Sequence, residues 1–131
     1  MATTRIARTA WEGNLAQGKG IVTFASSGIG EFPVSWPARS EEPNGLTSPE
    51  ELIAGAHSAC FSMALSHGLT QAEVTFQPGT GITGIHLTVT GDVPGLDADA
   101  FAAAAADAKA NCPVSQALAG TTITLTATLA E

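Results

Sequence analysis

The stretch Ser48-Pro49-Glu50-Glu51-Leu52-Ile53-Ala54-Gly55-Ala56-His57-Ser58-Ala59-Cys60-Phe61-Ser62-Met63-Ala64-Leu65-Ser66 decides the fold. It opens with a serine N-cap, a proline at the first helical position and a glutamate at the third, which together form a capping box. Gly68 is a suitable C-terminal stop for the helix that follows. Apolar and small side chains occur on every side of this helix. The pattern therefore predicts a buried helix that another backbone can approach closely.

Segments on both sides of this helix are typical of strands, because they are rich in β-branched residues or alternate apolar with polar side chains. These segments are 21–25, 32–36, 74–76, 85–90 and 122–129. The segment 32–36 is interrupted by proline, which limits it to an edge or an irregular strand. Residues 38–47 are expected to form a polar loop.

Two further helices are expected near the C-terminus. Asp97 can cap a helix over 98–111, and Pro113 ends it because the residue before a proline disfavours the α region. Pro113 can also open a short helix that extends through Leu118. The order of elements predicts an α+β fold with a mainly antiparallel sheet, in a single domain over residues 1–131.

Composition excludes several classes of function. The 131 residues carry a net charge of −7, so binding to nucleic acid or to an anionic membrane surface is not expected. The N-terminal residues contain no apolar stretch typical of a secretion signal, which predicts a cytoplasmic location. Only 5% of the residues are aromatic, and much of the apolar content is alanine. Such a thin core predicts that a second chain covers part of the molecule, as in a homodimer.

The two cysteines are the main candidates for chemistry. Cys60 lies within the buried helix, where a free cysteine is often only a small core residue. Cys112 directly precedes Pro113, at the N-cap of a short helix, where amide donors stabilise a thiolate and lower its pKa. The alternative is an unreactive capping residue. A cytosolic cysteine pair more often forms a transient, catalytic disulfide than a structural one.

The histidines are weak candidates for a metal site. Cys60, Cys112, His57 and His67 could in principle make a Cys₂His₂ zinc set, but the spacing lacks the close cysteine pair of structural zinc sites. No metal is therefore expected. His57 is interpreted as an interior residue, His67 as a cation in the last helical turn and His86 as an exposed strand residue.

Arg39 is unusual because it is one of only three arginines and lies in a proline-rich segment with several glutamates. A guanidinium lowers the pKa of a neighbouring thiol, and a carboxylate such as Glu50 can hold it in place. Glu50 precedes Cys60 by ten residues, which is about 15 Å along a helix. The pair could therefore serve Cys60 only if the loop folds back or a second chain supplies it. Otherwise, Arg39 is a solvated loop charge and Glu50 a helix N-terminal acid.

The sequence resembles the OsmC/Ohr family of thiol peroxidases. The resemblance is carried by two cysteine motifs, Thr47-Ser48-Pro49-Glu50-Glu51-Leu52-Ile53 running into Ala56–Ser66, and Ala108-Lys109-Ala110-Asn111-Cys112-Pro113-Val114-Ser115-Gln116-Ala117-Leu118. Residues 10–15, 18–20 and 93–95 also match, so the likeness covers nearly the whole chain. In combination the two cysteine motifs are highly specific.

The resemblance implies an intertwined homodimer whose strands wrap around central helices. It implies reduction of organic hydroperoxides in preference to hydrogen peroxide, with Cys60 as the peroxidatic and Cys112 as the resolving cysteine. An arginine–glutamate pair lies beside the reactive sulfur in this family, and Arg39 and Glu50 match it. Arginine in the loop before the first helix indicates the OsmC-type subgroup. The family needs no metal or flavin, and dithiols recycle it, with lipoyl groups as reductants chiefly in the organic hydroperoxide branch.

One segment departs from the family pattern. The passage from His67 to Val74 is shorter than the usual link. Either a strand or a loop before Val74 is trimmed, or a flexible segment is absent from this sequence, and the part concerned is the mouth of the pocket, with its substrate preference. Both cysteine motifs are intact. The alternative to a peroxidase is a non-enzymatic module that senses redox state or binds an apolar ligand.

Overall fold

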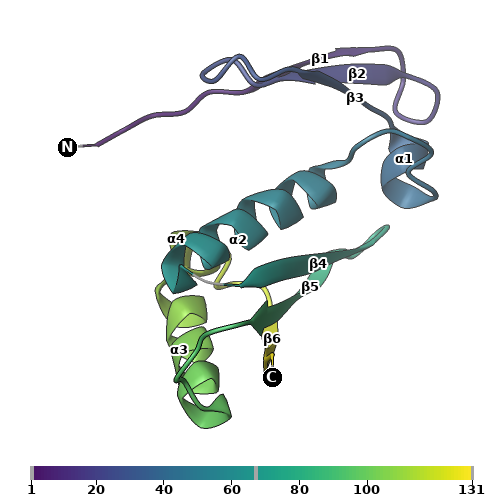
Figure 1. Ribbon diagram of the computed structural model, residues 1–131. Helices are drawn as coiled ribbons and strands as arrows, with labels where there is room; N and C mark the ends of the chain where they lie inside the picture. Colours follow the sequence, from purple (N-terminus) through teal and green to yellow (C-terminus); the bar gives the residue numbers. More distant parts are fainter. Residues whose placement is uncertain (1, 67, 131) are drawn as a thin grey trace. The chain divides into compact units, whose positions relative to one another are not determined.

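The computed structural model describes residues 2–66 and 68–130, which fall into two compact units, Met1–Pro49 and Glu50–Glu131. The first unit contains three antiparallel strands in the order β1-β2-β3, followed by one short helix (Figure 1). The strands are β1 (Arg8–Glu12), β2 (Lys19–Thr23) and β3 (Glu31–Val34). Trp11 of β1 pairs with Gly20 of β2, and a Cβ atom on Gly20 would lie 2.7 Å from the Trp11 ring. The glycine therefore leaves room for the indole.

The helix of the first unit, α1 (Trp36–Ser40), corrects the prediction of a polar loop from residue 38 onward. Ser35 caps it, because its Oγ accepts a hydrogen bond from the Ala38 amide at 3.2 Å. Pro37 lies in the first turn, where the missing N–H is tolerated. The strand predicted to reach Trp36 accordingly ends at Val34.

The second unit combines a three-stranded sheet with three helices. Its strands are β4 (Leu69–Gln77), β5 (Gly81–Gly91) and β6 (Ile123–Leu129), in the order β4-β5-β6. The helices are α2 (Pro49–Leu65), α3 (Ala98–Asn111) and α4 (Pro113–Ala117). β4 and β5 are antiparallel, but β5 and β6 are parallel, because the chain crosses over through α3 and α4 between them. The α+β class is confirmed.

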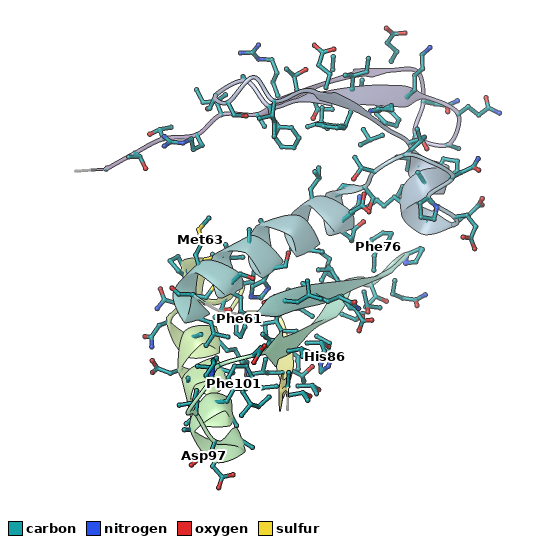
Figure 2. All side chains as sticks on the ribbon, viewed as in Figure 1. Phe61, Met63, Phe76, His86, Asp97 and Phe101 are labelled. Atoms are coloured by element: carbon teal, nitrogen blue, oxygen red, sulfur yellow. The ribbon has the colours of Figure 1, made fainter. Side chains whose placement is uncertain are left out.

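The core lies between the helices and one face of β5. Phe61 of α2 and Phe101 of α3 meet Leu87 and Val89 there, and all four side chains are at most 1% exposed. Figure 2 shows the two phenylalanines on the side of the sheet that faces the helices. The other face is polar. On it, His86 of β5 lies 2.6 Å from the Thr124 hydroxyl and 3.1 Å from that of Thr126 on β6, so this half-buried side chain links the parallel pair.

One stripe of α2 is not covered. Gly55, Ala59 and Met63 follow each other at four-residue intervals and are exposed, with Met63 at 77%. Figure 2 shows Met63 projecting from the helix away from the sheet. The second unit thus buries only one side of a helix whose sequence is apolar nearly all round, and the predicted burial of the other side depends on the predicted second chain.

The link between α2 and the next strand is a short turn. α2 ends at Leu65 and β4 begins at Leu69, and the backbone turns with a positive φ at Ser66 and Gly68. A Cβ atom on Gly68 would lie 2.6 Å from the Thr90 carbonyl oxygen, so the turn needs glycine here. β4 still spans nine residues. His67, predicted as a cation of the last helical turn, lies outside the described residues.

Candidate active site

The two cysteines lie on separate elements of the second unit. Cys60 is in the second half of α2 and is partly exposed. Cys112 is fully buried and forms both the C-cap of α3 and the N-cap of α4. Its extended backbone, with φ −60° and ψ 121°, is the conformation that the following Pro113 favours. The interruption of the helix by Pro113 therefore sets the position of the second thiol.

The two thiols interact, and their environments move their pKa values in opposite directions. Burial raises the pKa of Cys60, and the neighbouring Cys112 raises it further, although the Val114 amide acts the other way. Burial also works to raise the pKa of Cys112, but hydrogen bonding from Cys60, from Ser115 and from the Val114 amide outweighs it, so the pKa of Cys112 is lowered. Both cysteines are free thiols.

The N-terminus of α4 contributes to this effect as the sequence predicts. Cys112 makes no side-chain capping hydrogen bond of standard geometry. The amides of Val114 and Ser115 nevertheless face its sulfur and favour the thiolate. The Ser115 side chain acts in the same direction on the pKa of Cys112. Sequence reasoning missed this serine.

His57 is joined to Ser115 across the two helices. Nε2 of His57 lies 2.7 Å from Oγ of Ser115, and the two side chains are 0% and 6% exposed. The sequence correctly predicted an interior histidine. The sequence did not indicate that Ser115 is the partner of His57. The one available signal is that both lie three residues from a cysteine: His57 precedes Cys60 by three residues, and Ser115 follows Cys112 by three. Three residues along a helix place side chains on the same face.

Arg39 and Glu50 lie in different units. Arg39 is in the last turn of α1, in the first unit, and is half-buried. Glu50 is in the first turn of α2 and is only 6% exposed, whereas the adjacent Glu51 is exposed. That Arg39 and Glu50 act on the Cys60 thiol remains a prediction. The burial of Glu50 does separate it from an ordinary solvated acid at a helix N-terminus.

Metal-binding residues do not gather in the part of the chain that the structure describes. Within residues 2–66 and 68–130, no group of three or more His, Cys, Asp or Glu side chains could hold a metal ion. Two of the histidines already have partners. Nε2 of His57 contacts Ser115, and both ring nitrogens of His86 contact threonine hydroxyls.

An α+β fold with helices on one face of its sheet is shared with solved structures of OsmC-like proteins. The structure of an organic hydroperoxide resistance protein OsmC from Legionella pneumophila matches it with a TM-score of 0.69 and 22% identity, over 100% of this chain and 99% of that one. The OsmC-like protein of Mycoplasma pneumoniae gives a TM-score of 0.73 at 14% identity, with 100% of both chains covered. These likenesses establish the fold.

Sequence comparison establishes the family. The profile of the family described as OsmC-like protein matches residues 42–127. The chain is 42% identical over 122 residues to the peroxiredoxin OsmC of Escherichia coli K12, covering 82% of this chain and 85% of that protein. The Shigella flexneri peroxiredoxin OsmC gives the same values. The chain therefore belongs to the OsmC family, in its OsmC-type branch. No helix in the described part is long and apolar enough to cross a membrane.

Proposed function

We propose that the protein is a cysteine-based peroxidase that reduces organic hydroperoxides, and hydrogen peroxide more weakly. The observation that carries the proposal is the meeting of Cys60 and Cys112 between α2 and α4, in a chain of the OsmC family. Relatives with this fold or sequence are named peroxiredoxin OsmC and organic hydroperoxide resistance protein. Residues 1–131 would act as one OsmC-like domain.

The chemistry requires both sulfurs. The Cys60 thiolate attacks the terminal peroxide oxygen, the O–O bond breaks, and the alkoxide takes a proton to leave as the alcohol. Cys60 is now a sulfenic acid. Cys112 attacks it, a disulfide forms and water leaves. An external thiol reductant then restores both thiols, so that two electrons pass from the reductant to the peroxide in each cycle.

Exposure supports the two roles. Cys60 is partly exposed and can meet a peroxide from solvent, whereas Cys112 is fully buried. The lowered pKa of Cys112 suits a resolving nucleophile. Because burial raises the pKa of Cys60, the attacking thiolate needs a positive charge beside it, which we assign to Arg39 oriented by Glu50.

Partners follow from this cycle. The substrate is an organic hydroperoxide, and the reductant is a dithiol, with a lipoyl group as one candidate. A pair of free, redox-active thiols suits a reducing compartment, so we place the protein in the cytoplasm as a homodimer. A net charge of −7 argues against nucleic acid and anionic membranes as partners.

Turnover with excess dithiol tests the proposal. Cumene hydroperoxide and hydrogen peroxide are supplied to the wild type, Cys60→Ser and Cys112→Ser with dithiothreitol in excess. An enzyme consumes many equivalents of cumene hydroperoxide and loses this activity in Cys60→Ser. A redox sensor stops after one equivalent, and this outcome would replace the peroxidase with the non-enzymatic alternative. Substantial turnover by folded Cys60→Ser would overturn the assignment of the attacking sulfur.

A further inference from the structure

Two side-chain pairs connect α2 and α4 one helical turn apart. The first joins Cys60 to Cys112, and the second joins His57 to Ser115. Except for Cys60, these side chains are nearly inaccessible to solvent: His57 and Cys112 are 0% exposed and Ser115 is 6% exposed. Peroxide chemistry as proposed above uses only the first pair. The second pair also calls for an explanation, because burying polar groups costs free energy that the hydrogen bond between them only offsets.

The second pair can pass a hydrogen bond on to Cys112. The hydroxyl of Ser115 lowers the pKa of Cys112, as a donor directed at that sulfur would. A hydroxyl has only one proton, so with that proton directed at Cys112 the oxygen accepts from Nε2–H of His57, which lies 2.7 Å away. His57 is kept neutral because burial lowers its pKa. Its one ring proton is then on Nε2, and Nδ1 is a buried acceptor without a partner among the described residues.

We propose that His57 and Ser115 form a buried hydrogen-bond relay that activates Cys112 as the nucleophile that resolves oxidised Cys60. The proposal rests on the peroxidase function proposed above. In this relay Ser115 acts directly on the reacting sulfur and is a catalytic residue. His57 acts through Ser115 and is a positioning residue: its N–H fixes the hydroxyl proton on the side of Cys112.

The step balances in atoms and electrons. The sulfur of Cys112 forms a bond to the sulfur of Cys60 while the S–O bond of the sulfenic acid breaks. The leaving hydroxide takes up the proton that the Cys112 thiol released, so that one water is formed. Cys112 is oxidised as the Cys60 sulfur is reduced from the sulfenic to the disulfide state. When a reductant later attacks Cys60, Cys112 is the leaving thiolate, and the same hydroxyl donates to it.

Single-turnover kinetics separate a relay from a merely structural contact. Oxidation of Cys60 is followed with one equivalent of cumene hydroperoxide in a Cys112→Ser background. Resolution is followed in the presence of Cys112 by the lifetime of the sulfenic acid, trapped with dimedone. We expect Ser115→Ala to leave oxidation unchanged and to lengthen that lifetime about tenfold, a typical effect of one hydrogen bond to a charged group. His57→Leu should act in the same direction, and His57→Gln, which keeps an N–H donor, should act less.

Matched variants control for packing. Ser115→Thr and Ser115→Val have nearly the same shape and differ in whether they keep the hydroxyl, so only the valine should slow resolution. Ser58→Ala removes a hydroxyl on α2 that bonds to the Gly55 carbonyl, and it should change neither step. Equal slowing of oxidation and resolution in Ser115→Ala, or equal rates for the threonine and valine variants, would overturn the relay.

The disulfide reduction potential provides a second readout that does not depend on peroxide. Stabilising the Cys112 thiolate favours the reduced form, so Ser115→Val should have a more negative potential than Ser115→Thr, by about 30 mV for a tenfold change. If the wild type forms no sulfenic acid with peroxide, the proposed function fails, and the potential alone decides on the relay. Equal potentials for the two variants would then reject it.

Discussion

The ring of Phe101 packs directly on the backbone of Gly91. A Cβ atom on Gly91 would lie 2.3 Å from Cε1 and 2.4 Å from Cζ of that ring, which is only 1% exposed. Gly91 is the last residue of β5, and Phe101 is in the first turn of α3, the helix that leads to Cys112. This contact therefore fixes the helix that carries the second thiol against the sheet.

Gly91→Ala should destabilise the fold by about 1–3 kcal/mol, because a methyl group has no room unless the buried ring moves. Urea unfolding at fixed protein concentration measures the change. Gly84→Ala is the matched control on the same strand: its Cβ would lie 3.7 Å from the nearest atom, the Thr122 carbonyl oxygen, and its effect should stay within about 0.5 kcal/mol. Similar losses of stability in both variants would show that the glycines of this strand matter for their backbone flexibility, and not for the space that Gly91 leaves for the Phe101 ring.

The uncovered stripe of α2 should be the contact between two copies of the chain. Gly55, Ala59 and Met63 are exposed and small or apolar, which suits close helix packing. Sedimentation at micromolar concentration should give about twice the 13.2 kDa chain mass. Ala59→Arg should reduce the mass to that of one chain or prevent folding, whereas Ala103→Arg, at an exposed position of α3, should leave the dimer intact. A folded monomer at all concentrations would contradict the dimer.

His57 should make the fold sensitive to mild acid. Burial lowers the pKa of His57 below its ordinary 6.5, so as the pH falls through that value the unfolded chain takes up a proton that the folded chain does not. Stability is therefore lost as the pH falls, by at most about 1.4 kcal/mol per pH unit from this group. Urea unfolding at pH 7.5 and 5.5 should show a smaller loss for His57→Gln than for the wild type. His86→Gln, which also removes one histidine, is the control, and an equal loss in all three proteins would mean that His57 is not held neutral.

Local signals predicted the second unit well. Asp97 and Pro113 border α3, and the predicted helix over 98–111 agrees with the observed one because a cap and a proline act on their nearest neighbours. In the first unit, α1 was missed, since Trp36 continued the alternation of the preceding strand and the capping by Ser35 was not recognised. The parallel pairing of β5 and β6 depends on how the chain crosses over, which strand patterns do not record.

The sequence was enough to predict the reactive cysteines of the candidate site, but not the side chains that surround them. Cys60 and Cys112 stood out by residue type and by the motifs around them. Ser115 did not, because it serves through a contact with His57, 58 residues away in the chain. A serine inside a helix is most often a solvent-exposed residue without a specific partner. Only the structure, which brings α4 next to α2, shows that Ser115 is buried and contacts His57.

The last prediction concerns Arg39. A thiol of ordinary pKa, about 8.5, is only a few per cent thiolate at neutral pH. The thiolate fraction of Cys60 is smaller still, because burial and the adjacent Cys112 both raise its pKa. Arg39→Ala should raise the Cys60 pKa by a further unit or so, the typical effect of losing an adjacent charge. Peroxide reduction should fall steeply at neutral pH and recover partly in alkaline solution, where the thiolate forms without help.

Recovery should be incomplete, because the arginine would also stabilise the alkoxide that leaves. Glu50→Ala should give a milder form of the same defect by releasing the guanidinium. Arg8→Ala, which removes an exposed arginine of β1, is the matched control and should leave the pH profile of Cys60 alkylation and turnover unchanged. If Arg39→Ala behaves like this control, the charge of Arg39 does not reach Cys60, and another group must hold the attacking sulfur as a thiolate.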